Sequence, residues 1–198
     1  MRIHRGRDRL PPLEADALTD VQRRAAEELA AGPRGGVIGP FVPLLRSPEL
    51  LQHAQRMGEY LRYRSAIGTR LSELAILLIA RFWSQQVEWS IHAPIAAKVG
   101  IAAETIRAIA AARRPEILSD DETIVYELCF ELNVNQDVSD STFERALARF
   151  GEQGVVDLIG LNGYYTFLAM VMNAAHTAPA ATSVPALAPL PPRTWFAI

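Results

Sequence analysis

The sequence is poor in cysteine, and this scarcity excludes several kinds of chemistry. Cys129 is the one cysteine among 198 residues. A disulfide within the chain, a Cys-x-x-Cys redox pair and a metal centre built on several cysteines are therefore impossible. Reduction of peroxides by a thiolate and a resolving thiol is excluded with them. Because Cys129, in the stretch YELCFEL, lies in a predicted helix and has no partner cysteine, we expect it to be a core residue.

The sequence also lacks an excess of charge of one sign and long apolar runs. The net charge is −2, with 21% charged and 49% hydrophobic residues. A nucleic-acid-binding protein normally carries a basic patch or stripe, so we expect no nucleic-acid partner. Without a run of about 18 apolar residues, we expect no membrane span. The N-terminal stretch MRIHRGRDRLPP lacks the apolar segment of a signal peptide, which favours the cytoplasm.

Apolar residues that recur every three or four positions indicate an all-α fold of about eight helices. No stretch shows the convincing alternation of apolar and polar residues that is typical of paired strands. The strongest pattern is RLSELAILLIARFW, which predicts a core helix, and a break is expected near Trp83 or Ser84. Including that core helix, helices are predicted over 18–31, 48–64, 68–83, 85–100, 102–112, 118–133, 138–151 and 152–176.

The chain is expected to form a single helical domain over residues 1–178. An arm over residues 1–14 precedes the first helix, and a Gly/Pro-rich loop covers residues 32–47. The loop has no Gly-Lys-Ser/Thr ending and no strand before it, so it does not resemble a phosphate-binding P-loop. The Pro/Ala-rich tail over residues 179–198 is not expected to form a regular element, although its apolar end TWFAI should dock on this subunit or a neighbour.

The segment WSQQVEWSIHAP carries three polar side chains in an otherwise apolar run. An α-helix advances about 100° per residue, so Gln85, Glu88 and His92 would lie within a sector of roughly 60°. Glu88 and His92 are four residues apart, and such a pair suits general acid–base catalysis near neutral pH. The alternative is a core network or ion pair without a catalytic role.

A metal site is a weaker interpretation of the same segment. Glu88 and His92 offer two ligands, whereas a catalytic zinc usually has three from the protein. The other histidines, His4, His53 and His176, form no ligand motif with them, so we expect no metal site.

Three further side chains in apolar helices are also possible site residues. Glu73 lies near the start of the core helix, where the helix dipole favours a carboxylate, and the alternative is a solvent-facing residue. Tyr164 and Tyr165 are expected to be core or interface aromatics. Catalysis by a Ser–His–acid triad has no support, because Gly-x-Ser-x-Gly is absent.

The stretch RLSELAILLIARFWSQQVEWSIHAPIAAKVGI resembles the carboxymuconolactone decarboxylase family, whose members have the alkylhydroperoxidase D-like fold. The stretch GVVDLIGLNGYYTFLAMVMNA resembles the last helix of that family, and the resemblance covers about residues 48–175. The peroxidase branch of the superfamily has cysteines where this chain has Gln85 and Glu88. The residues that fit the decarboxylase pattern are Arg70, Glu73, Glu88, Trp89, His92, Ala96 and Gly100.

The resemblance implies an alkylhydroperoxidase D-like helical bundle and a cofactor-free lyase that acts on a small cyclic carboxylate or lactone. His92 would be the general acid or base, Glu88 would orient it or exchange protons, and Glu73 would hold the imidazole. Gln85 would donate a hydrogen bond to the lactone oxygen, and Trp89 would form a wall of the pocket. The family also implies self-association as a trimer or hexamer.

Other functions stay open at this point. The same site would suit a hydratase or an isomerase, and the polar residues would also suit a non-catalytic oligomeric binding protein. A carboxylated substrate needs a cation, and the sequence does not decide among the arginines on the candidate helices. These are Arg46, Arg62, Arg64, Arg70 and Arg81.

Overall fold

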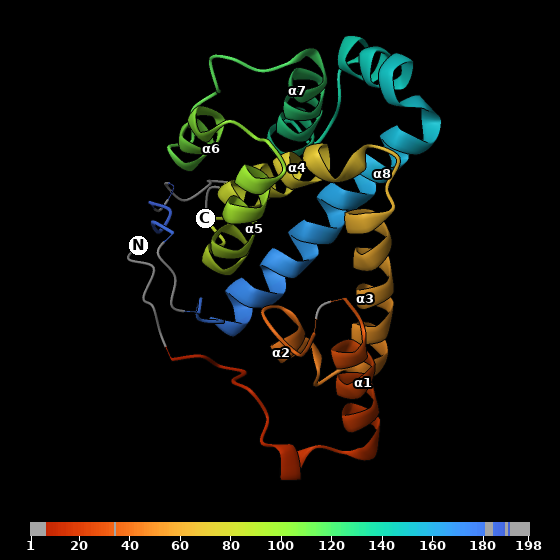
Figure 1. The fold of residues 1–198 in the computed structure, drawn as a ribbon, viewed down its shortest axis with the longest axis vertical. Helices are drawn as coiled ribbons and strands as arrows, with labels where there is room; N and C mark the ends of the chain where they lie inside the picture. Colours follow the sequence, from red (N-terminus) through yellow and green to blue (C-terminus); the bar gives the residue numbers. More distant parts are fainter. Residues whose placement is uncertain (1–6, 34, 181–183, 189, 191–198) are drawn as a thin grey trace, which may run out of the picture.

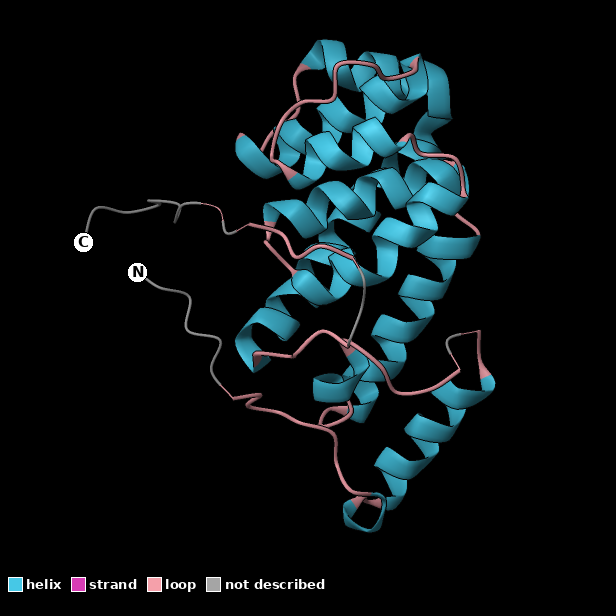
Figure 2. Ribbon diagram, turned by 60° about the vertical axis from the view of Figure 1, so that its left-hand side comes forward, coloured by secondary structure: helices cyan, strands magenta, loops and turns pink. Residues whose placement is uncertain are grey.

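Helices form the framework of the chain in a computed structural model, which describes residues 7–33, 35–180, 184–188 and 190 (Figure 1). Those residues contain no strand, so the all-α class is confirmed (Figure 2). The elements are the 3-10 helix η1 (Ala15–Ala17) and the α-helices α1 (Asp20–Ala31), α2 (Phe41–Leu44), α3 (Pro48–Tyr63), α4 (Gly68–Phe82), α5 (Gln86–Lys98), α6 (Ala103–Ala110), α7 (Asp120–Val134) and α8 (Asp140–Ala175).

Helix α4 lies at the centre of the fold and packs against α3, α5, α6, α7 and α8 (Figure 1). Its sequence is apolar on nearly every face, and a helix of that kind must be covered on all sides. Ten of its 15 residues are buried. The core helix expected from the sequence pattern is therefore confirmed.

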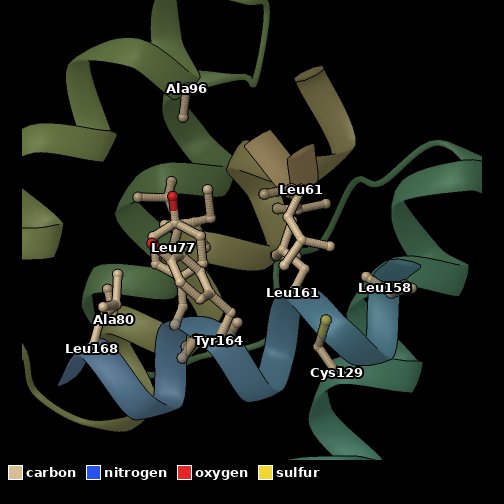
Figure 3. Packing of buried hydrophobic residues seen from close by; sticks show 14 of the residues in the cluster. Leu61, Leu77, Ala80, Ala96, Cys129, Leu158, Leu161, Tyr164 and Leu168 are labelled. Carbon is tan, nitrogen blue, oxygen red and sulfur yellow. The ribbon is translucent and has the colours of Figure 1, made fainter. Parts of the chain in front are cut away.

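The longest helix, α8, supplies the other half of the core. Leu77 and Ala80 of α4 pack near Tyr164 and Leu168 of α8 (Figure 3). The two helices predicted over 138–151 and 152–176 form this one element, which kinks at Gly151. The φ and ψ angles of Gly151 are 67° and 175°, a conformation that essentially only glycine adopts without strain.

By length and apolar composition alone, α8 is also long enough to cross a membrane. However, 56% of the apolar 18-residue stretch in this helix is buried inside the protein. Core helices of soluble proteins have the same length and composition, so this helix is weak evidence for a membrane location.

Capping residues define several helix starts. Thr19 and Ser119 form capping boxes with Gln22 and Glu122, as the Ser/Thr-x-x-Gln/Glu pattern predicts. Ser47 stands at the predicted start of α3, but its hydroxyl makes no capping hydrogen bond. The predicted loop over 32–47 contains one helical turn, α2, which the glycines and prolines around it conceal in the sequence.

The described part of the C-terminal tail has no regular structure but packs against α4 and α5. The backbone N–H of Leu187 donates to Gln86 Oε1 over 2.9 Å, and Gln86 Nε2 donates to the Leu187 carbonyl over 3.1 Å. The Leu187 side chain is buried. Residues 184–188 are called the strap below. The predicted docking of TWFAI lies outside the described residues.

Candidate active site

A tight turn between α4 and α5 brings the polar side chains of the two helices together. The N–H of Gln85 donates to the Ala80 carbonyl over 2.8 Å, and the N–H of Ser84 donates to the Arg81 carbonyl over 3.0 Å. These two bonds form a Schellman motif, in which Ser84 takes the left-handed conformation with a φ of 49°. The chain reverses there, so α5 packs along α4.

This turn changes the interpretation of Gln85, which is the N-cap of α5 and has an extended backbone. The predicted helix over 85–100 begins one residue later, so Gln85 does not share the helical face of Glu88 and His92. Its Oε1 accepts the N–H of Val87 over 2.7 Å, and its Nε2 donates to Asn173 Oδ1 over 2.8 Å. The amide of Gln85 is thus engaged at both ends.

Glu73 joins an imidazole and a guanidinium inside the protein. His92 Nδ1 lies 2.7 Å from Glu73 Oε2, and Arg62 Nε lies 3.5 Å from Glu73 Oε1. Glu73 has an exposed fraction of 0% and His92 of 5%. Glu73 stands in the second turn of α4, so the interpretation as a solvent-facing residue of the first turn is wrong. A carboxylate on Nδ1 fixes the tautomer and the orientation of the ring.

A cavity of about 270 Å³ opens beside this cluster. His92 and Glu88 of α5 line it, together with Arg62 from α3 and Tyr165 from α8. Neither Gln85 nor Trp89 is among its lining residues within the described chain, and Trp89 is buried in the core. The rest of the lining comes mostly from apolar residues and from the segment before α3: Pro33, Ile38, Pro40, Phe41, Tyr63, Val87, Ile91 and Leu168.

Glu88 faces this cavity without a partner in the described chain. Both of its carboxylate oxygens are buried, and neither forms a hydrogen bond there, not even to His92 four residues on. Burial raises the pKa of the Glu88 carboxyl well above its usual range. The physical cause is loss of water around the charged form, which favours the neutral acid. The site therefore combines a partnered glutamate with an unpartnered one.

Two side chains at the cavity were not identified as site residues in the sequence. The ring of Tyr165 meets His92 edge-on, with 5.3 Å between the ring centroids and an interplanar angle of 89°. Burial raises the pKa of the Tyr165 hydroxyl well above its usual range. Arg62 was one of five candidate arginines, and nothing in the sequence distinguished it. The position of both side chains at the cavity depends on contacts between helices, and local sequence patterns do not predict such contacts.

Metal binding and thiol chemistry were the other kinds of site that the sequence raised. No three or more His, Cys, Asp or Glu side chains within the described residues are grouped to hold a metal ion. Cys129 is buried and accepts a hydrogen bond from Asn162 Nδ2 over 3.2 Å. Burial raises the pKa of its thiol to about 12, so the nucleophilic thiolate is scarce at neutral pH.

The chain was also compared with known proteins. No family model, curated protein or solved structure matches it. The functional interpretation therefore depends on the geometry of the site and on the sequence motif.

Proposed function

We propose that the protein is a cofactor-free acid–base lyase of the carboxymuconolactone decarboxylase type, with an alkylhydroperoxidase D-like arrangement of its helices. Its substrate would be a small cyclic carboxylate or lactone bound in the cavity beside His92. One observation carries the proposal: a buried carboxylate, Glu73, holds Nδ1 of a histidine that lines a cavity. That arrangement is typical of a histidine positioned for proton transfer.

The reaction needs a proton donor and a cation, and the cavity has both. As the bond to the carboxylate breaks and CO₂ leaves, its electron pair delocalises into the conjugated lactone. Arg62 stabilises the negative charge that develops on the lactone oxygen. His92 then transfers a proton to the distal carbon through Nε2, and water restores the proton. Gln85 is not needed for this step, since its amide is already bound to Val87 and Asn173.

Glu88 has a separate role in this proposal. A neutral carboxyl does not repel a carboxylated substrate, whereas a second ionised glutamate at the cavity would. Its raised pKa therefore favours entry of an anion at neutral pH. The family resemblance also implies trimers or hexamers, which the exposed apolar side chains of α8, Val156, Ile159 and Met170, support.

The test is release of CO₂ from 4-carboxymuconolactone by His92→Gln, with His53→Gln as the matched control. His53 is exposed on α3, away from the cavity lining. Removal of a general acid–base residue costs about 10²- to 10⁴-fold in turnover. We expect a loss of that size in His92→Gln and none in His53→Gln.

Full activity in a folded His92→Gln protein would contradict the proposal. If the protein consumes the lactone without releasing CO₂, and this activity still depends on His92, the protein is a hydratase or an isomerase with the same site. If the wild-type protein binds the lactone but never converts it, the non-catalytic interpretation is correct.

A further inference from the structure

A second cavity, of about 200 Å³, lies between α4, the end of α6 and α7. Leu78 and Phe82 of α4, Ile109 at the end of α6, and Tyr126 and Phe130 of α7 give it an apolar and aromatic wall. Leu190 of the tail also lines it. None of its lining residues lines the cavity at His92.

Arg81 brings an uncompensated charge to this apolar cavity. The residue is 5% exposed, and its Nη1 donates to the Ala188 carbonyl of the strap over 2.7 Å. Its Nε is buried without a hydrogen-bond partner, and no carboxylate pairs with Arg81 among the residues that the structure describes. A buried N–H donor of a guanidinium without a hydrogen-bond partner carries a free-energy cost.

Two other arginines, one on α4 and one next to Arg113 in the chain, form ion pairs. Arg70 pairs with Glu122, and Arg114 pairs with Glu127. Arg113 is exposed at the second cavity and, like Arg81, forms no ion pair within the described part of the chain. Two arginines without an ion pair among the described residues therefore line one cavity.

We propose that this cavity is a binding site for a small organic carboxylate with an aromatic or similarly apolar body. The carboxylate would accept hydrogen bonds from the Arg81 guanidinium, and the ring would lie among Ile109, Tyr126 and Phe130. A cavity of about 150 Å³ is large enough for benzene, so 200 Å³ suits a single ring with one substituent. Inorganic phosphate fits less well, because the wall offers few donors besides the arginines.

The site is separate from the proposed active site. Arg81 follows Glu73 by eight residues on the same helix, which places the two Cα atoms about 12 Å apart. The inference therefore does not depend on the proposed lyase activity, and the two can fail independently.

The test uses benzoate as the probe in isothermal titration calorimetry of the full chain. Benzamide has the same ring without the charge, and acetate has the charge without the ring. We expect benzoate to bind and both analogues to bind at least tenfold more weakly. Arg81→Met should weaken benzoate at least tenfold, whereas Arg62→Met, the matched change at the other cavity, should leave it within twofold.

Arg81→Met removes a buried charge and is expected to fold. Arg81→Lys provides a second variant, which keeps the charge but loses the planar fork, and an intermediate affinity is expected. Three results would each overturn the inference: no heat of binding with benzoate, equal affinity for benzamide, or an affinity that persists in Arg81→Met. Loss of binding in Arg62→Met alone would assign benzoate to the cavity at His92 and overturn it as well.

Discussion

Two buried glutamates lie on the helices that meet at His92, one behind the imidazole and one at the cavity, in opposite environments. Glu73, on the α4 side, contacts His92 and lies 3.5 Å from Arg62. Glu88, on the α5 side, has no hydrogen-bond partner among the described residues. Burial is nearly the same, at 0% and 3% exposed, so it does not separate them. The comparison teaches that the interaction partners of a buried carboxyl, rather than its depth of burial, determine its role. Glu73 has partners and positions His92, whereas Glu88 has none among the described residues, which favours its neutral acid form.

Glu73→Gln should produce the largest change in stability. The amide keeps the shape of the side chain but removes the charge that compensates the Arg62 guanidinium. Loss of a buried charged partner costs about 3 kcal/mol in the free energy of unfolding. Urea unfolding at pH 7 measures this as a lower midpoint with an unchanged slope.

The matched control is Glu88→Gln, which makes the same chemical change at the other buried glutamate. It should not destabilise the protein at pH 7. Equal losses in the two variants would show that Glu73 and Glu88 have equivalent environments and would remove the basis of the comparison.

Glu88→Gln should instead change how stability depends on pH. The unfolded carboxyl ionises near pH 4.3, whereas burial raises the pKa of Glu88 in the folded protein. Between these two values the unfolded state binds fewer protons, so the free energy of unfolding of the wild type falls as pH rises. The amide does not titrate, so the variant should gain stability relative to the wild type as pH rises through this range, by at most about 1.4 kcal/mol per pH unit.

Urea unfolding of both proteins from pH 4 to pH 8 measures this difference, and Glu49→Gln serves as the control. Glu49 is exposed in the first turn of α3, so its substitution should give a small, nearly constant difference. A difference between Glu88→Gln and the wild type that does not grow with pH would show that Glu88 ionises normally.

Much of the fold was predictable, because helical periodicity and caps are local. The apolar spacing around Leu74 and Leu77 predicts a helix covered on all sides, and α4 is that helix. The break near Ser84 and the interruption of the helical pattern at Gly151 were also predictable. The single turn of α2 was not, because Gly and Pro around it carry the signal of a loop.

The site was predictable only in part, for a physical reason. Glu73, Glu88 and His92 lie within a short motif, and the structure brings all three to one buried region. Arg62 of α3 and Tyr165 of α8 also contact that region, although Tyr165 is far from the motif in the sequence. No local pattern predicts such contacts between helices. Gln85 was assigned by helical spacing, which fails at a residue that precedes the helix.

Gln85→Ala should have the smallest effect, and it separates a structural role from a catalytic one. Gln85 caps α5 and bonds to Asn173, so its loss should cost about 1 kcal/mol in the free energy of unfolding. Because Gln85 does not line the cavity, turnover of the lactone should stay within about twofold of the wild type. Loss of one oxyanion donor costs about 10²- to 10³-fold in turnover. A loss of that size in a stable Gln85→Ala protein would therefore place the amide at the substrate and show that α5 rearranges when the substrate binds.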